Sequence, residues 1–441
     1  MTETTMTEAT ATRKLDLKEV VAMGVGAMVG GGIFSVLGLA MGQAGHAAPI
    51  AFALGGAIAL LTGLSYAHLG LTFRSDGGSF TYLEEAFSHP NIAGLGGWLL
   101  LVGYIGTMGL YAYTFGAYGS ALLGSDGNPA VHHMLESLVL LVFLGINLYG
   151  VKEAGTAELV IVTIKVLILI LFAVIGLTTV QADHLLPVFN QGELGVVMGA
   201  ALIFVAYEGF ELIPNAVNEM QHPERNLKRG ILISIVITLV IYVLVSLVAV
   251  GNLTPEQVTR FGEYALAEAA RPFLGQAGFI LIGIAALFST SSAINATLFG
   301  TARLGSEMAR KKSLPEVFSL MRQENDIPWV SLLIIAGVTL LFVNASDLTM
   351  ISSFASSTFL LIFFAINLSA WRLRQRVSLP GLWPLLGMTL SMASWMVLMF
   401  WLWQKDLKSL YWVGGAYAAV VVAELVFSQR RLFLRDKLPN S

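Results

Sequence analysis

Few side chains in this sequence could carry chemistry, and each lies in an apolar segment. Lys165 lies within "IVTIKVLILILF", and it is the only charged residue between Glu158 and Asp183. Glu208 and Glu211 follow each other closely within "YEGFELIPNAVNE". A charged side chain at the centre of a membrane helix costs roughly 2.5–3.5 kcal/mol on insertion scales. These residues therefore need either a functional or a structural reason.

Lys165 could bind and release a proton. Burial among isoleucine, leucine and valine side chains penalises the charged ammonium and so favours its neutral form. We therefore expect Lys165 to couple a proton to the activity of the protein. The structural alternative is a lysine that pairs with a buried glutamate or reaches an interface, and its long apolar flanks disfavour the second of these.

The two glutamates suit the recognition of a positive charge. One carboxylate could face a substrate amine, and the other could form part of a gate or a proton path. If Glu208 faces the ligand, charge complementarity favours an amine or a cation. In the structural alternative, backbone N–H groups freed by a helix break satisfy both carboxylates.

A glycine run in the first apolar segment could bind an anion through its backbone. The stretch "VAMGVGAMVGGGIFSVLG" contains the consecutive glycines Gly30, Gly31 and Gly32. Glycine lets the backbone turn, and the free N–H groups at the start of the following half-helix suit a carboxylate. Helix packing through Gly26 and Gly30 is the alternative, but it leaves Gly31 and Gly32 unexplained.

The elements that must position these residues are membrane helices. The 441 residues are 56% hydrophobic and 12% charged, whereas soluble domains have about 25% charged residues. Apolar runs of about 20 residues, the length that crosses a bilayer, predict an all-α membrane protein with twelve transmembrane helices. The sequence has no cysteine, no phosphate-binding loop and no metal-ligand spacing. We therefore expect no enzymatic activity, cofactor, metal or nucleic-acid partner.

Basic residues predict the orientation in the membrane. With the N-terminus inside, twenty Lys and Arg residues lie in inside segments and four in outside loops, while Lys165 lies within a span. The positive-inside rule then places both termini in the cytoplasm. We expect the chain in the cytoplasmic (inner) membrane of the cell.

Helix breaks predict an internal repeat. The glycine run interrupts the first span, and Gly209 and Pro214 interrupt the sixth. In lipid, such breaks are tolerated only where the freed backbone faces protein or a water-filled cavity. Repeats of five spans must have opposite orientations, so we predict a five-plus-five inverted repeat with a site at the midplane. The predicted parts are a tail 1–16, a first repeat 17–180, a second repeat 192–376, two accessory helices within 381–429 and a tail 430–441.

Four motifs occur in order along the chain. They are "GVGAMVGGGIF", "VIVTIKVLILILFAVIG", "FVAYEGFE" with "NEMQHPERNLKRGI", and "ALFSTSSAINATLFGTARLGSEMARKKSLPEVF". These motifs resemble the amino acid–polyamine–organocation transporter superfamily, in particular its proton-coupled bacterial and archaeal amino acid permeases. The resemblance runs from about Leu15 to Arg376. It implies the five-plus-five inverted-repeat fold shared with sodium-coupled neurotransmitter transporters.

The resemblance also implies roles for individual residues. The glycine run would bind the substrate carboxylate, and the unwound part of the sixth span would receive the amine. Lys165 would stand where sodium-coupled relatives hold a cation, reaching groups at Gly26 and Ser289. Glu211 matches a family glutamate linked to gating, whereas Glu208 stands where the family usually has an apolar residue. The implied substrate-binding residues are Gly30, Gly31, Gly32, Ala206, Tyr207, Glu208 and Gly209.

Together these features lead us to expect a secondary active transporter. It would move an amino acid or related amine by alternating access, in symport with protons, within the lipid bilayer. The alternatives are an exchanger of amino acids or polyamines, and a carrier of cationic amines that uses Glu208. A transporter-like sensor is a further alternative, which the short basic C-terminal tail does not favour.

Overall fold

The computed structural model describes residues 14–75, 77–150, 155–322 and 326–427. Within these ranges the chain forms helices and no β-strand, and its β-pairing is limited to two isolated bridges, Leu15 with Met220 and Arg322 with Ile327. The prediction of an all-helical protein is confirmed for this part of the chain. The predicted C-terminal tail 430–441, and the N-terminal tail up to residue 13, lie outside the described residues.

Helices follow one another along the whole described chain. The α-helices are α1 (Leu17–Met28), α2 (Gly32–Ala44), α3 (Ala48–Phe73), α4 (Gly78–Ala86), α5 (Pro90–Leu122), α6 (Pro129–Tyr149), α7 (Gly155–Gly176), α8 (Gly192–Leu202), α9 (Pro223–Asn252), α10 (Pro255–Phe261), α11 (Ala265–Arg310), α12 (Trp329–Asn344), α13 (Leu348–Arg372), α14 (Leu382–Lys405) and α15 (Leu407–Phe427). Short 3₁₀ helices connect them: η1 (Gly45–Ala47), η2 (Leu177–Thr179), η3 (Ala182–Leu185), η4 (Phe204–Tyr207), η5 (Phe210–Glu219), η6 (Gly262–Tyr264) and η7 (Glu316–Ser319).

The lengths of these helices identify a multi-pass membrane protein. Among the described residues, nine helices are long and apolar enough to cross a membrane, or up to ten if the bent pair Gly192–Leu202 and Phe204–Glu219 is one span. This count is lower than the predicted twelve, for physical reasons. α1 and α8, with 12 and 11 residues, are pieces of interrupted helices. α12 has only 16 residues, and the run Gly32–Phe73 joins α2 to α3.

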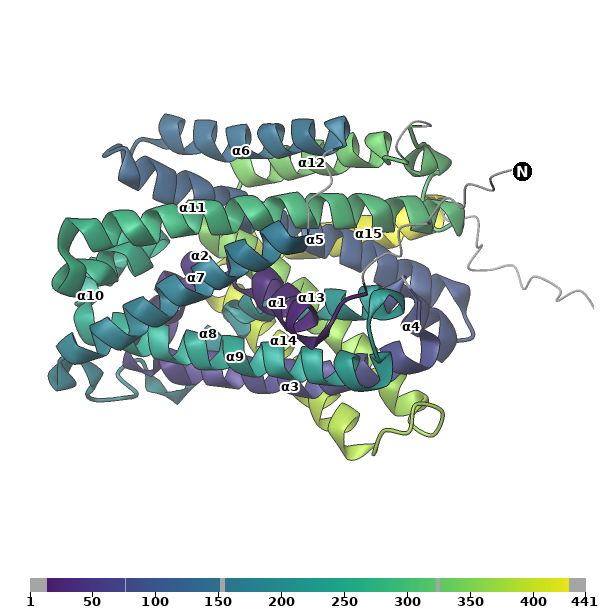
Figure 1. Cartoon of the computed structure of the whole chain (residues 1–441), viewed down its shortest axis with the longest axis horizontal. Helices are drawn as coiled ribbons and strands as arrows, with labels where there is room; N and C mark the ends of the chain where they lie inside the picture. The colour runs from purple at the N-terminus through teal and green to yellow at the C-terminus, as the bar shows by residue number, and fades with distance from the viewer. Residues whose placement is uncertain (1–13, 76, 151–154, 323–325, 428–441) are drawn as a thin grey trace, which may run out of the picture.

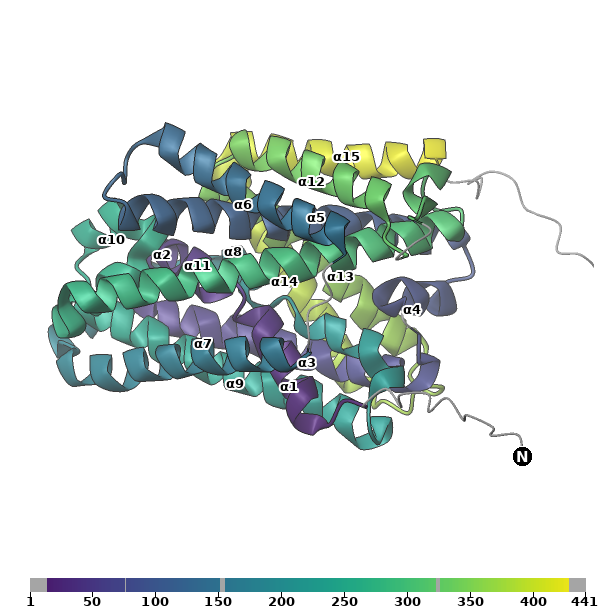
Figure 2. The ribbon, with the colours of Figure 1, turned by 45° about the horizontal axis from the view of Figure 1, so that its top comes forward.

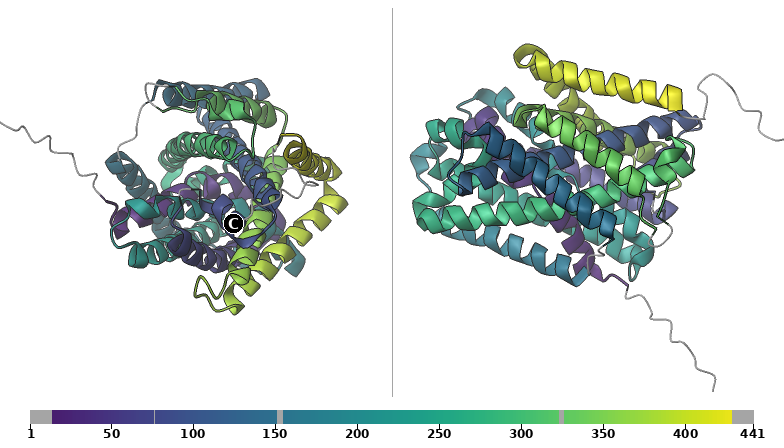
Figure 3. Two further views of the ribbon diagram at one scale, coloured as in Figure 1. Left: turned by 90° about the vertical axis from the view of Figure 1, so that its right-hand side faces the viewer. Right: turned by 90° about the horizontal axis from the view of Figure 1, so that it is seen from above.

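The long helices run side by side along the longest axis of the molecule (Figures 1 and 2). Seen end-on, they form a bundle (Figure 3, left). α3 packs against α9, and α6 packs against α12 on the other side of α11 (Figure 1). Most residues of α2 are buried. The interrupted helices therefore lie inside the bundle, where other helices surround their backbone.

Capping residues define where helices begin. Asp16 accepts hydrogen bonds from the backbone N–H groups of Lys18 and Glu19, and the Glu19 carboxylate accepts one from the backbone of Asp16. Asp347 caps α13 by accepting from the N–H of Met350 at 2.9 Å. Such contacts satisfy N–H groups that have no partner within the helix. The cap at Asp16 fixes the start of α1 and thereby the position of the glycines that follow.

Candidate functional site

α1 and α2 are two pieces of one interrupted helix. α1 ends at Met28 and α2 begins at Gly32, and we call Val29–Gly31 the first break. No described residue accepts a hydrogen bond from the backbone N–H groups of Gly31 or Gly32. These groups lie at the positive end of the α2 dipole, which favours negative charge. The first break therefore offers free donors suited to a carboxylate.

α8 and the 3₁₀ helices after it form the second interruption. The chain bends by 50° between α8 and the segment Phe204–Glu219, and we call Ile203–Gly209 the second break. Gly209 has φ +126°, a conformation that a residue with a Cβ rarely adopts. Pro214 lacks a backbone N–H and lies within η5, where it opposes an α-helical hydrogen-bond pattern.

The two breaks lie directly against each other. A Cβ on Gly32 would lie 2.8 Å from both the Cα and the carbonyl oxygen of Ala206. A Cβ on Gly209 would lie 2.8 Å from the carbonyl carbon of Ala27. Separations this short leave no room for a side chain at either glycine. The interrupted helices therefore meet through bare backbone, and the structure brings together Gly32, Ala206 and Gly209 from the predicted site.

Tyr242 on α9 contacts both interrupted helices. Its hydroxyl group lies 2.7 Å from the carbonyl oxygen of Met28 and 3.0 Å from that of Ala206, both within hydrogen-bonding distance. Its side chain is fully buried. Tyr242 thus links the end of α1 to the second break.

Serine hydroxyls on two further helices satisfy other backbone groups at the breaks. Ser289 on α11 donates to the carbonyl oxygen of Val29 at 2.6 Å. Ser356 on α13 donates to the carbonyl oxygen of Leu202 at 2.7 Å and accepts from the N–H of Val205 at 3.0 Å. An unsatisfied buried carbonyl or N–H group costs about 1–3 kcal/mol. These hydroxyls therefore offset part of the free-energy cost of interrupting helices inside an apolar bundle.

One face of α5 contacts both breaks. The ring of Tyr111 packs against Gly31, where any Cβ would overlap it. Thr107, one helical turn earlier, donates to the carboxylate of Glu208. Residues four apart share a helix face, so α5 contacts the first break through an aromatic ring and the second through a hydroxyl.

Both predicted glutamates are buried beside the second break. Glu208 is 4% exposed and Glu211 is 2% exposed. Glu211 accepts from the N–H of Gly209 at 2.7 Å and from the hydroxyl of Tyr104 at 3.5 Å. Neither carboxylate forms an ion pair with a basic side chain of the described ranges. A backbone N–H therefore donates to Glu211, as the structural alternative expected, whereas the donor to Glu208 is the side chain of Thr107.

Two other predicted residues face away from the contact between the breaks. A Cβ on Gly30 would lie 2.8 Å from the Cβ of Ala293, so Gly30 faces α11. The Tyr207 hydroxyl donates to the carbonyl oxygen of Phe52 on α3 at 2.6 Å. Gly30 thus also has the packing role that the sequence left open.

The residues predicted to handle a proton lie on helices that pack together. Lys165 on α7 is 3% exposed. Gly26 on α1 faces Val162, one turn before Lys165, where a Cβ would overlap the valine side chain. Ser289 contacts the first break from α11, and α7 packs against both α1 and α11. The buried lysine is therefore carried by a helix that adjoins the first interrupted helix.

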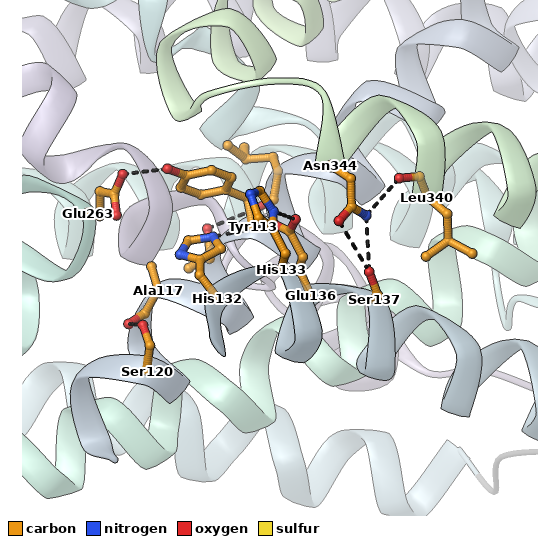
Figure 4. Close-up of polar contacts among 12 residues, drawn as sticks. Tyr113, Ala117, Ser120, His132, His133, Glu136, Ser137, Glu263, Leu340 and Asn344 are labelled. Atoms are coloured by element: carbon orange, nitrogen blue, oxygen red, sulfur yellow. Dashed lines mark hydrogen bonds and ion pairs between the residues drawn. The ribbon is translucent and has the colours of Figure 1, made fainter. Parts of the chain in front are cut away.

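Figure 4 shows a separate polar cluster that joins α5, α6 and η6. The Glu136 carboxylate lies 2.6 Å from His133 Nδ1 and 3.3 Å from His132 Nε2. The His132 ring packs on Tyr113, with ring centroids 4.3 Å apart, and Tyr113 donates to Glu263. The sequence did not predict this cluster. It ties α5, whose other residues contact the breaks, to α6 and η6.

A cavity lies next to this cluster. Its volume is about 670 Å³, and its lining includes Gly38 of α2 together with Asp126, Glu263 and Asp347. No three His, Asp or Glu side chains in the described part of the chain are grouped so as to hold a metal ion.

Tyr242, Thr107 and Ser356 contact the breaks but were not predicted as site residues. A hydroxyl inside an apolar helix often bonds to its own backbone. Its presence therefore gives only a weak signal of contact with another helix.

Comparisons with known proteins identify the family of the chain. The model of a family described as amino acid permease matches residues 15–423. An uncharacterized protein of Methanocaldococcus jannaschii is 32% identical over 419 residues, which cover 94% of this chain and 95% of that protein. The serine/threonine exchanger SteT of Bacillus subtilis is 28% identical, over 78% of this chain and 80% of its own.

A third relative is the vacuolar cationic amino acid transporter 8 of Arabidopsis thaliana. It is 26% identical, over 90% of this chain and 69% of its own. The named relatives are transporters, not enzymes. With the family model matching nearly all of a multi-pass helical chain, this protein belongs to the amino acid permease family of the amino acid–polyamine–organocation superfamily.

Proposed function

We propose that the protein is a secondary active transporter that carries an amino acid or related amine, together with a proton, across the cell membrane by alternating access. The observation that carries this proposal is the direct contact between two interrupted helices, with free N–H donors at one break and a buried carboxylate at the other. In membrane transporters, such paired interruptions form substrate sites near the bilayer midplane.

The two breaks suit opposite ends of an amino acid. Free N–H groups at Gly31 and Gly32 would bind the carboxylate, with Gly30 shaping the same turn. The ammonium would lie at the second break, among Ala206, Tyr207, Glu208 and Gly209. A zwitterion would thereby bridge the two interrupted helices, so that its binding would depend on their separation.

Proton coupling is assigned to Lys165. Its burial on α7 supports a group that changes charge during transport, because a permanent charge there would be costly. Gly26 and Ser289 would form its surroundings when it is protonated. Glu211, held by the N–H of Gly209 and the hydroxyl of Tyr104, would act in gating because its contacts join the end of the second break to α5.

The proposed topology has twelve spans. α1 with α2 would form the first, α8 with η4 and η5 the sixth, and the short α12 the ninth. Residues 17–180 and 192–376 would then form the inverted repeats, with accessory spans within 381–429. Both termini would be cytoplasmic, in the inner membrane.

A second candidate is a carrier or exchanger of cationic amines. Glu208 favours it, because a buried carboxylate without a basic partner in the described ranges suits a second positive charge. Of the relatives, the cationic amino acid transporter fits the substrate charge of this candidate, and the serine/threonine exchanger fits its mode of transport.

Thermal stabilisation of the purified full chain tests the proposal. The ligands are the twenty standard amino acids, each beside its decarboxylated amine and its α-hydroxy acid. A ligand at 100 times its Kd stabilises the folded state by about 2.7 kcal/mol, so binding raises the melting temperature. We expect at least one amino acid to do so and its decarboxylated amine to fail.

Stabilisation by the amine alone would show that the glycines do not bind a carboxylate, and no stabilisation by any amino acid or amine would refute the proposal. In vesicles, uptake driven by a pH gradient supports symport. Strict dependence on internal substrate would instead identify an exchanger, and a preference for L-arginine over L-serine would favour the cationic candidate.

A further inference from the structure

We propose that the hydroxyl group of Tyr242 replaces the substrate ammonium when the site is empty, by donating to the backbone carbonyls that the two helix interruptions leave without a backbone donor. Tyr242 would then be a positioning residue for transport. The inference rests on the proposed function, because it requires an amine-bearing substrate between the breaks.

The geometry singles out Tyr242 among the buried tyrosines. Its hydroxyl group lies 2.7 Å from the carbonyl oxygen of Met28 and 3.0 Å from that of Ala206, although it belongs to neither interrupted helix. A Cβ on Gly32 would lie 2.7 Å from the same hydroxyl. The hydroxyl therefore adjoins the free donors of the first break.

Both carbonyls are unpaired within their own helices. In an unbroken helix, the carbonyl of Met28 would accept from Gly32 and that of Ala206 from Phe210. Among the described residues no backbone N–H donates to either oxygen. Tyr242 supplies the donor that unwinding removed.

A single hydroxyl proton cannot fully satisfy two carbonyls. A phenol has one O–H donor, so the group donates to one oxygen and leaves the other able to accept. An ammonium has three N–H donors. When an amine binds, its ammonium can donate to one carbonyl oxygen while Tyr242 donates to the other. Alternatively, the ammonium can donate to both oxygens in place of Tyr242.

The consequence concerns the empty carrier. Net uptake requires the protein to change conformation with no substrate bound. In exchange, the protein changes conformation only with substrate bound. Without the hydroxyl, both carbonyls would be unsatisfied in the empty state, and the substrate ammonium would gain more by binding. Tyr242→Phe should therefore bind substrate more tightly and complete net uptake more slowly.

The test compares wild type with Tyr242→Phe and Tyr66→Phe. Tyr66 is an equally buried tyrosine on α3 whose hydroxyl bonds to Ser79 on α4, at 2.7 Å. The ligand is the standard amino acid that most stabilises the wild type. For Y242F we expect about tenfold tighter Kd, the effect of relieving one buried carbonyl. We also expect net uptake in vesicles to fall by a similar factor while exchange is retained.

A structural role alone would lower net uptake and exchange together and would not tighten binding. An unchanged or weaker Kd in Y242F, or the same changes in Y66F, would overturn the inference. The α-hydroxy acid counterpart of the same amino acid lacks the ammonium and should show no gain in affinity. If wild type binds no amino acid, the proposed function fails instead, so the two failures are distinguishable.

Discussion

Replacing Gly209 with alanine tests whether the two breaks touch as closely as described. Gly209 has φ +126°, which is unfavourable for any residue with a Cβ. The added Cβ would also lie 2.8 Å from the carbonyl carbon of Ala27 and 2.9 Å from the backbone nitrogen of Met28. Both atoms belong to the backbone of α1, so they cannot rotate away. G209A must therefore force the interrupted helices apart.

The expected loss of stability has two parts. A left-handed backbone conformation costs a residue with a Cβ roughly 1–2 kcal/mol. Adding a methyl group to a closely packed site costs typically about 1–3 kcal/mol. If the contributions add, G209A should lower the free energy of unfolding by about 2–5 kcal/mol.

Three other glycines separate these contributions. Gly275, in the kink of α11, has φ +61° and no atom within 4 Å of an added Cβ, so G275A has the backbone cost alone. Gly32 has no positive φ, but an added Cβ would lie 2.8 Å from the backbone of Ala206, so G32A has the contact cost alone. Gly300 has neither feature, and alanine is favoured over glycine in a helix by about 0.8–1.0 kcal/mol.

The assay is thermal unfolding of the detergent-purified variants, followed by intrinsic tryptophan fluorescence, beside amino acid uptake in vesicles. Melting temperatures should fall in the order G300A, then G275A and G32A, then G209A, with G300A at or above wild type. Uptake should be lost in G32A and G209A but kept in G275A. If G209A melts no lower than G275A, or G32A melts like G300A, the breaks do not meet as described.

Three further substitutions test separate contacts. Lys165→Ala should abolish the dependence of uptake on a pH gradient, measured with fixed substrate at varied external pH, because it removes the proposed proton carrier. Ser289→Ala should lower the free energy of unfolding by about 1–3 kcal/mol by leaving the carbonyl of Val29 without its donor. Ser356→Ala should cost a similar amount, since it leaves the N–H of Val205 without its acceptor, and thermal unfolding measures both.

Matched variants control these experiments. Lys165→Arg keeps a positive charge that does not deprotonate in proteins, so persistent pH dependence in it would refute proton transfer by Lys165. Thr290→Val and Ser369→Ala remove hydroxyls that donate within their own helices, to Ala286 and Ala365 at 2.8 Å. Equal destabilisation by these two variants would contradict a special role for the serines at the breaks.

Local chain properties made the helix interruptions predictable from the sequence. Gly30 to Gly32 and Gly209 remove side chains that stabilise helices, and Pro214 removes a backbone donor. The structure has α1 ending at Met28, directly before the glycine run, whereas the bend after Leu202 comes seven residues before Gly209. Hydropathy likewise identified a helical membrane protein, although it could not separate short interrupted pieces from complete spans.

The side chains that support the breaks could not be predicted in this way. Tyr242 is 214 residues from Met28 along the chain, and Ser289 is 260 residues from Val29. No local pattern reports contacts at such separations. In an apolar helix, a hydroxyl that bonds to its own backbone has the same sequence signature as one that bonds to another helix.

The distribution of these hydroxyls explains how a broken helix can persist in an apolar interior. The first break depends on Ser289 of α11, the second on Ser356 of α13, and Tyr242 of α9 contacts both interrupted helices. None of these donors belongs to an interrupted helix, so the surrounding bundle rather than the broken segment stabilises the freed backbone groups. A movement that separates the breaks must therefore exchange these hydrogen bonds for others, and a zwitterion with its own donors and acceptors is the kind of molecule that can supply them.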